Sequence, residues 1–378
     1  MPEPRVLHVV ATAQLRGAET FAGDLVGALN RLGVPQRVAV LRRTPGPAAR
    51  FDAPTTVLPA GWRAPGVRID VRTSRALGGL IRRARPDVVL AHGGEPFKYA
   101  ALLPGVPPIV YRKIGLAAPW ITSAMSRWAH GRLMRRAARV VAVGEEIRRE
   151  LVEDFGLPAG RVVTIPTGRD RRTFEAAGAD GERATARRSL GIPQGTEVIV
   201  SLLALTPEKD PVGHVDVVRD VGERHPDAVY LVAGDGPLRG AVESAVQRNG
   251  LHDRVRLLGS TASVPTLLAA ADVHLLASRS EGIPSSLIEA GMAGIPSAAY
   301  DVGGVAEVVV DGETGLLAPP GHRPLLADHV GRLLADPAGR RAMGRAARRR
   351  CTDRFDIASI AGSFLTVLRS VAGRASRG

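Results

Sequence analysis

Short apolar runs alternate with longer amphipathic stretches along almost the whole chain, and this alternation restricts the fold more than any other feature. In the first half, runs rich in Val, Leu and Ile lie at 5–12, 37–43, 55–59, 87–93, 108–113 and 139–144. Helical stretches are expected between most of them, at about 18–32, 72–84, 120–137 and 145–155. Near-continuous apolar strands that alternate with helices are typical of a parallel sheet covered on both faces.

A second series of the same kind begins near Gly191. Its apolar runs lie at 196–205, 228–234, 254–259, 272–278 and 296–300, with helices expected at about 212–224, 237–249, 264–271 and 286–293. Two βα series in succession predict an α/β fold with two doubly wound, Rossmann-like domains. We expect these domains at 1–170 and 191–355, with the polar, Gly/Ala-rich segment 171–190 as the linker.

In such domains ligands bind at the carboxyl ends of the strands, and two of them side by side predict a site in a central cleft. Residues that bind a ligand or act in catalysis are therefore expected in the loops that follow the strands. The chain has only three lysines, Lys98, Lys113 and Lys209, and each follows or ends a predicted strand.

The composition of the chain restricts the cellular compartment of the protein and the class of molecule that it binds. The one cysteine, Cys351, excludes an intramolecular disulfide and a cysteine metal cluster, which fits a reducing, cytoplasmic compartment. No apolar run approaches the ~20 residues that span a bilayer, and the first run lacks the basic flank of a signal peptide. The net charge of +14 fits an anionic partner or a bias towards arginine. Basic and aromatic residues are not interleaved as in nucleic-acid modules, so no nucleic-acid partner is expected.

The richest loop follows the run at 272–278. Gly282 and Pro284 predict a turn, and Ser285 or Ser286 can then begin a helix whose amide groups form an anion site suited to a diphosphate. Two carboxylates flank this helix start, Glu281 before it and Glu289 one turn inside it.

Both glutamates have a simpler interpretation. Ser286 and Glu289 fit a capping box, which would only secure the helix, and Glu281 fits a solvated loop charge. A carboxylate beside a diphosphate repels the ligand unless it binds hydroxyl groups. Spacing alone leaves these interpretations open, and a functional pair favours a ligand with both phosphates and sugar rings.

The stretch 278–321 resembles the defining motif of the family-four retaining glycosyltransferases, which have the GT-B fold. That motif has two glutamates separated by seven residues, then a helix of small residues, Gly-x-Pro and a Gly-Gly turn. The matching residues are Glu281, Gly282, Glu289, Ala290, Gly294, Pro296, Gly303, Gly304, Glu307, Gly312 and Gly315. A weaker resemblance extends over essentially the whole chain, for example at 232–239 and 255–259.

The resemblance implies a role for each donor-side residue. Glu281 would contact the donor sugar and Glu289 the nucleotide ribose. The amides from Ile283 to Ser286, with Lys209, would approach the diphosphate. The loop 203–210 resembles the family's loop that carries an Arg and a Lys, but Ala204 stands at the Arg position. Arg279, Arg112 or Lys113 are candidates to replace that cation.

The N-terminal half is similar to the family's acceptor domain, with departures. Gly17 matches one glycine of the family's Gly-Gly loop. His92, at a strand end, is a candidate for acceptor binding or proton transfer, or else a structural histidine. Ile114 appears where many relatives have a sugar-contacting His, which leaves Arg112 and Lys113 as the nearest polar candidates.

Two helical segments have further expected roles. The segment 118–140, with Trp120 and Trp128, fits either a helix that covers the sheet or an amphipathic helix at an anionic membrane. The Arg-rich stretch 339–354 is expected to be a solvated helix face. The last helix, 356–378, resembles the GT-B tail that crosses back to the N-terminal domain.

Taken with the residues, the resemblance implies a retaining transfer of a sugar from a nucleoside-diphosphate donor, with UDP the expected carrier, to a hydroxyl group. The acceptor would be a glycan, a lipid-linked saccharide or a small metabolite. Neither a catalytic metal nor a cofactor is expected. Two alternatives remain: a nucleotide-sugar epimerase of the same fold, or a nucleotide-sugar-binding protein with impaired catalysis, as the departures at Ala204 and Ile114 suggest.

Overall fold

The structure is a computed structural model that describes residues 3–44, 47–59, 69–117, 121, 123–178, 181–261 and 263–375. It divides into two compact units. Unit 1 consists of Met1–Gly168 and Ile357–Gly378, and unit 2 is Arg169–Asp356. Each unit contains one parallel sheet with helices on both faces, which confirms the predicted α/β, doubly wound fold class.

The sheet of unit 1 has seven parallel strands in the order β3-β2-β1-β4-β5-β6-β7. Its strands are β1 (Val6–Val10), β2 (Gln36–Val40), β3 (Thr55–Val57), β4 (Val88–His92), β5 (Ile109–Lys113), β6 (Arg139–Ala142) and β7 (Val162–Thr164). Its helices are α1 (Gly17–Arg31), α2 (Val71–Ala84), α3 (Gly94–Leu102), α4 (Ala124–Met134), α5 (Glu145–Arg149) and α14 (Ile357–Ala375).

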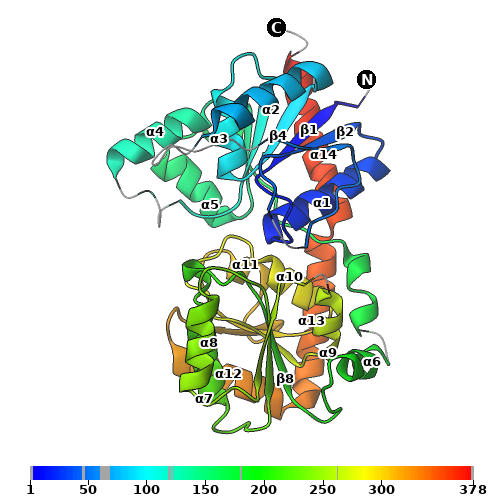
Figure 1. Ribbon diagram of the computed structural model, residues 1–378, viewed down its shortest axis with the longest axis vertical. Coiled ribbons are helices and arrows are strands. Elements are labelled where there is room, and N and C mark those ends of the chain that lie inside the picture. Colours follow the sequence, from blue (N-terminus) through cyan, green and yellow to red (C-terminus); the bar gives the residue numbers. More distant parts are fainter. Residues whose placement is uncertain are drawn as a thin grey trace. The chain divides into compact units, whose positions relative to one another are not determined.

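Helix α14 is the last element of the chain, yet it packs beside α1 (Figure 1). The two helices cover one face of the sheet with a shared apolar core that includes Phe21, Leu25 and Phe364, all fully buried. Burial of large apolar side chains is worth about 1.5–3 kcal/mol each, so this core fixes α14 firmly to unit 1.

The sheet of unit 2 has six parallel strands in the order β10-β9-β8-β11-β12-β13. Its strands are β8 (Val198–Leu202), β9 (Val229–Ala233), β10 (Val255–Gly259), β11 (Val273–Leu276), β12 (Ser297–Tyr300) and β13 (Gly315–Ala318). Its helices are α6 (Glu182–Ser189), α7 (Pro211–Val221), α8 (Arg239–Arg248), α9 (Val264–Ala270), α10 (Ser285–Met292), α11 (Val305–Val308), α12 (Arg323–Ala335) and α13 (Pro337–Phe355).

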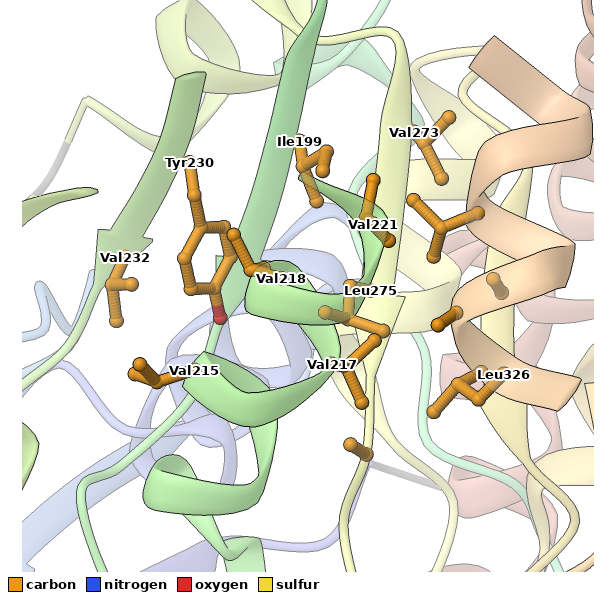
Figure 2. Packing of buried hydrophobic residues seen from close by; sticks show 14 of the residues in the cluster. Ile199, Val215, Val217, Val218, Val221, Tyr230, Val232, Val273, Leu275 and Leu326 are labelled. Atoms are coloured by element: carbon orange, nitrogen blue, oxygen red, sulfur yellow. The ribbon is translucent and has the colours of Figure 1, made fainter. Parts of the chain in front are cut away.

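The core of unit 2 lies between its sheet and the layer formed by α7, α8 and α12, with α9, α10 and α13 on the opposite face (Figure 1). Figure 2 shows the valines of α7 packed against Ile199, Tyr230 and Leu275 of the strands and Leu326 of α12. This core is built mainly from Val, Leu and Ala, since aromatic residues make up only 4% of the chain. It gives the loops at the carboxyl ends of β8 and β11 a rigid base.

Both sheets reverse their strand order at one point, between β1 and β4 in unit 1 and between β8 and β11 in unit 2. The loops that leave two neighbouring strands at such a point run to opposite faces, which opens a crevice where ligands bind. In unit 2 these are the loop 203–210 and the loop 277–284, the two loops with the richest motifs.

The segment 171–190, predicted as a linker, is part of unit 2, and its described residues include α6. Arg187 of this helix is fully buried, where it donates to Asp272 at 2.9 Å and to the carbonyl of Ala270. Arg183 and Arg340 also pair with Asp272. Buried ion pairs therefore help to anchor this polar sequence, together with the packing of α6 against α9.

Candidate active site

Lys209 and Glu281 form an ion pair at the carboxyl edge of the sheet of unit 2. Lys209 ends a short 3₁₀ helix (Pro207–Lys209) after β8, and Glu281 lies in the loop after β11. The Lys209 Nζ atom donates to Glu281 Oε2 at 2.5 Å. The sequence places these two residues far apart, and the reversal of strand order between β8 and β11 brings them together.

The Glu281 carboxylate is buried, with its side chain only 4% exposed. Among the described residues, its Oε1 atom has no hydrogen-bond partner. A buried acceptor without a donor costs about 1–3 kcal/mol, and a hydroxyl group of a ligand would remove that cost. This environment excludes the interpretation of Glu281 as a solvated loop charge.

His214 holds the two loops in register. Its Nδ1 atom lies 2.9 Å from the Asp210 carbonyl oxygen, and its Nε2 atom accepts from the Ala277 amide at 2.9 Å. Nδ1 must then carry the proton, and the ring must be neutral. Burial lowers the pKa of His214 to about 4, which keeps it neutral at physiological pH. No sequence pattern predicted this role, since His214 lies inside a predicted helix.

Arg279 forms a second link between the same loops. Its Nε atom donates to Asp210 Oδ2 at 2.8 Å, and its backbone amide donates to the Glu208 carbonyl at 2.9 Å. The Arg279 side chain is 72% exposed. An exposed cation thus lies on the loop that carries Glu281 and is bonded to Asp210, the residue that follows Lys209.

The paired glycines of the motif, Gly303 and Gly304, pack against the backbone of the Glu281 loop. Gly303 has a φ of +56°, and a Cβ atom there would lie 1.9 Å from the Glu281 carbonyl oxygen. A Cβ on Gly304 would lie 2.3 Å from the Gly282 carbonyl oxygen, which accepts from the Gly304 amide at 2.9 Å. Only glycine permits this close backbone contact. The Gly-Gly turn therefore fixes the position of the Glu281 loop relative to the turn.

Helix α10 begins at Ser285, directly after that loop. Its N-cap is Pro284, in an extended conformation and without a side-chain cap, and its first turn contains no acidic residue. Because Ser286 lies inside the helix rather than at the N-cap, it does not form the capping box that the sequence left open. The amides from Ile283 to Ser286 lie where the helix dipole favours an anion.

Glu289 pairs with Arg169, the first residue of unit 2. The Arg169 Nε and Glu289 Oε1 atoms are 2.8 Å apart, and the two side chains are 9% and 12% exposed. Sequence reasoning missed Arg169 because it placed this residue at the end of the N-terminal domain, beside the linker.

The loop with Ala204 is fixed by the turn after β9. A Cβ on Gly234 would lie 1.7 Å from the Leu203 carbonyl oxygen, and one on Gly236 would lie 2.5 Å from that of Leu205. The Leu205 amide donates to the backbone carbonyl of Asp235 at 3.1 Å. The motif at 232–239 therefore packs against the backbone around Ala204, and no cation stands at position 204.

Two of the site residues predicted in unit 1, His92 and Arg112, are buried near the ends of β4 and β5. His92 is 3% exposed, and its Nε2 atom lies 3.1 Å from Nδ1 of His8 on β1. Burial lowers the pKa of His92 well below its usual value. The Arg112 guanidinium lies 3.7 Å from the centre of the Phe21 ring and donates to Thr167 Oγ1 at 2.8 Å.

Arg112 itself is 1% exposed, and burial lowers its pKa to about 9. Among the described residues, its Nε and Nη1 atoms have no hydrogen-bond partner. The carboxylate of Glu19 raises that pKa again and is buried in turn, 3.4 Å from Thr12 Oγ1. Sequence reasoning missed Glu19, although it lies only two residues after Gly17, where α1 begins.

Lys113 and Ile114 follow Arg112 and have structural contacts. Lys113 Nζ lies 3.5 Å from Glu150 Oε2 and donates to the Gly115 carbonyl. The other carboxylate oxygen of Glu150 accepts from the Ala117 amide at 2.7 Å. Ile114 lies near Gly93, where an added Cβ would be 3.4 Å from its side chain. Lys113 is thus bound to its own unit.

Helix α4 corresponds to the predicted helix 120–137 and carries Met125 and Trp128, which are 74% and 63% exposed. Trp120 lies outside the described residues. Within the part of the chain that the structure describes, no helix is long and apolar enough to cross a membrane. The Arg-rich helix α13 exposes most of its arginines, as predicted, and buries Ala347, Cys351 and Phe355.

Comparison with known proteins assigns a family to both halves of the chain. Residues 182–350 match the model described as glycosyl transferases group 1, and residues 15–172 match that of glycosyltransferase family 4. The chain is 32% identical to a 2-deoxystreptamine glucosyltransferase of Streptomyces kanamyceticus, over 92% of this chain and 97% of that protein. A 2-deoxystreptamine N-acetyl-D-glucosaminyltransferase of Streptomyces fradiae is 31% identical, over 80% and 75% of the two chains.

Among solved structures, the chain resembles Anabaena HepE in complex with UDP-glucose. The TM-score is 0.84 at 20% identity, over 97% of this chain and 100% of that one. This likeness confirms the GT-B fold. The family matches confirm the predicted activity class, a retaining glycosyltransferase with a nucleotide-sugar donor. The chain therefore belongs to the family 4 glycosyltransferases of the group 1 type.

Proposed function

We propose that this glycosyltransferase takes its sugar from a uridine-diphosphate donor bound at the carboxyl edge of unit 2. The observation that carries the proposal is the buried Glu281 carboxylate just before α10. One of its oxygens accepts from Lys209, and the other has no hydrogen-bond partner among the residues that the structure describes. A site that offers an acceptor for hydroxyl groups next to donors for an anion suits a sugar diphosphate. HepE was solved with UDP-glucose, which supports uridine as the carrier.

Each residue then has a proposed role. Lys209 and the amides of Ile283–Ser286 stabilise the charge on the departing diphosphate, an electrostatic contribution that requires no catalytic metal. Glu281 orients the donor sugar, and Glu289 accepts from the ribose hydroxyls. Gly282 and Pro284 shape the turn that brings the amides to the phosphates.

We propose that Arg279 replaces the cation of the family's arginine, whose position is occupied here by Ala204. It lies on the loop of Glu281, its guanidinium is bonded to Asp210, and its exposure leaves room to turn towards a phosphate. Lys113, by contrast, is held by Glu150, and Arg112 is buried on Phe21.

In the proposed reaction the bond between the anomeric carbon and the diphosphate oxygen breaks, and a bond to an acceptor hydroxyl oxygen forms on the same face. The hydroxyl proton passes to the departing diphosphate, so no protein nucleophile is required. The product keeps the anomeric configuration of the donor.

On the acceptor side we propose supporting roles for His92 and Arg112, because both already contact groups of their own unit. His92 lies against His8, and Arg112 stacks on Phe21 and donates to Thr167. His92 would define the shape of the edge near β4, and Arg112 would add positive potential there. Gly17, at the first turn of α1, would let the backbone approach the ligand.

The relatives suggest which acceptors to test first. Two of them act, by name, on 2-deoxystreptamine, and another, from Escherichia coli, acts on a diphosphoundecaprenol-linked sugar. We propose an amino-bearing cyclitol as the acceptor class, because the relative that covers nearly the whole chain points to it. A cytoplasmic location, with peripheral membrane contact through 118–140, remains a prediction that matters only for the lipid-linked alternative.

A thermal-shift screen of nucleotide-sugars followed by a transfer assay tests the proposal. A ligand present at 100 times its Kd stabilises the native state by about 2.7 kcal/mol. We expect UDP-sugars to raise Tm, and UDP to be released only when 2-deoxystreptamine or a related acceptor is present. Conversion of the donor alone would indicate an epimerase. Binding without UDP release under any acceptor would indicate a catalytically impaired protein, and no shift with any UDP-sugar would contradict the donor assignment.

A further inference from the structure

Arg169 is held rigidly at the point where the chain enters unit 2. Its backbone amide donates to the Phe355 carbonyl at 2.9 Å, and it forms a parallel bridge with Asp356, where the chain leaves the unit. Its guanidinium lies 5.8 Å from the centre of the Phe174 ring, which is fully buried. Backbone and side chain are therefore restrained from separate directions.

The restrained guanidinium contacts the carboxylate to which we assign the ribose. Arg169 Nε lies 2.8 Å from Glu289 Oε1, and both side chains are largely buried. Glu289 extends from α10, the helix whose first turn is the proposed diphosphate site. A long glutamate side chain has several rotamers, and an ion pair with a fixed arginine selects one of them.

We propose that Arg169 is a positioning residue for ribose recognition: it holds the Glu289 carboxylate in the orientation that accepts the ribose hydroxyls. The inference rests on the proposed ribose role of Glu289. A carboxylate offers about four lone-pair sites, so an ion pair with Arg169 is compatible with further hydrogen bonds to a ligand. Arg169 would not touch the nucleotide, and its effect would pass through Glu289 alone.

A purely structural ion pair makes a different prediction. If Arg169 only fastened α10 to the start of unit 2, its loss would weaken every nucleotide equally, because the whole helix would move. If it orients Glu289, its loss weakens only nucleotides that carry ribose hydroxyls. A ligand pair that differs in those hydroxyls alone separates the two cases.

The experiment measures Kd by calorimetry for UDP and for 2′,3′-dideoxyuridine 5′-diphosphate, on the full chain. Hydrogen bonds to a charged group contribute about 1.5–3 kcal/mol, so the unmodified protein should prefer UDP by about tenfold or more. Glu289→Gln should lose most of that preference. Arg169→Met should lose at least threefold of it, with the Kd of the dideoxy nucleotide unchanged, and Arg169→Lys should restore part.

Arg183→Met is the matched control. Arg183 also pairs with a buried carboxylate of unit 2, Asp272, which keeps Arg187 and Arg340 as partners. This variant should keep the full preference for UDP. If Arg169→Met folds poorly, Arg169→Gln takes its place, with an intermediate loss expected.

The outcomes separate the two proposals. If Glu289→Gln loses the preference while Arg169→Met keeps it, or weakens both nucleotides alike, the positioning role is overturned and the ribose role of Glu289 stands. If the unmodified protein shows no preference, or Glu289→Gln retains it, the ribose role falls and the inference falls with it.

Discussion

The carboxyl edges of the two sheets have the same topology but use their polar residues differently. Each sheet reverses its strand order once, and charged residues lie beside each reversal. In unit 1 Arg112 is almost completely buried on Phe21, whereas in unit 2 the Lys209 side chain is 26% exposed and pairs with Glu281. The same fold thus provides one edge where the arginine is committed to packing and one where the lysine stays partly exposed beside a buried carboxylate.

The strand reversal thus opens a crevice in both sheets, and the residues of the adjacent loops determine what each crevice can bind. In unit 2, the paired glycines pack against the backbone of the Glu281 loop, and His214 joins that loop to the loop of Lys209. Preorganised groups of this kind are what electrostatic catalysis requires. Four variants test this contrast between the two edges, in decreasing order of expected effect.

Gly303→Ala should have the largest effect. Its Cβ would meet the Glu281 carbonyl at 1.9 Å with φ at +56°, so the backbone must shift. We expect a loss of about 2–4 kcal/mol in the free energy of unfolding, measured with urea, and loss of UDP binding. Gly321→Ala is the control, because φ there is +75° with no atom within 4 Å, and it should cost only about 1 kcal/mol. Equal effects of both variants would contradict the close support of the Glu281 loop.

Lys209→Ala should reduce kcat by about 10²- to 10³-fold, the usual effect of removing one preorganised charge donor. The donor KM should change much less, because the proposed contact strengthens as the diphosphate departs. Initial rates at saturating acceptor measure both constants. Lys98→Ala, a lysine of unit 1 on α3, should behave like the unmodified protein. A rate for Lys209→Ala within threefold of the unmodified enzyme would remove Lys209 from the mechanism.

His214→Gln tests the link between the two loops through pH. Because the pKa of His214 falls from 6.5 unfolded to about 4 folded, its contribution to stability is complete above pH 6.5 and is lost as the pH falls towards 4. The loss amounts to about 3 kcal/mol. Urea unfolding at pH 7 and pH 4 should therefore show a smaller difference for the variant than for the unmodified protein. His8 of unit 1, with a pKa also lowered to about 4, should leave its own pH dependence in both. Identical pH dependence in the two proteins would refute the neutral bridge.

Arg279→Ala should have the smallest effect, a decrease in kcat of about three- to tenfold. The side chain is 72% exposed, and solvent weakens the action of such a charge on a phosphate. Arg224→Ala, an exposed arginine that pairs with Asp328, should leave the rate unchanged. A full rate for Arg279→Ala would leave the cation lost at Ala204 without a replacement.

Much of the fold was predictable because apolar runs report buried parallel strands directly. The strands β7 (Val162–Thr164) and β13 (Gly315–Ala318) were missed, because glycine and proline residues close to both ends of each strand favour turns. Helix α6 was hidden for another reason. Its buried residues are Ala186 and Arg187, and the distant Asp272 explains why the charged Arg187 lies inside.

The residues of the candidate site also fall into those that the sequence predicted and those that it did not. Lys209, Glu281 and the paired glycines were identified because their spacing within a motif matches a family. Arg169 and His214 were not, because each acts through a partner far along the chain, Glu289 or Ala277. Sequence patterns show which residues meet a ligand more readily than they show which residues hold those residues in place.

The most direct test of the donor site is a crystal structure of the protein with UDP bound. We expect the diphosphate within hydrogen-bond distance of Lys209 Nζ and of amides between Ile283 and Ser286, with the ribose hydroxyls on Glu289. UDP bound elsewhere, or with its phosphates away from the start of α10, would contradict it.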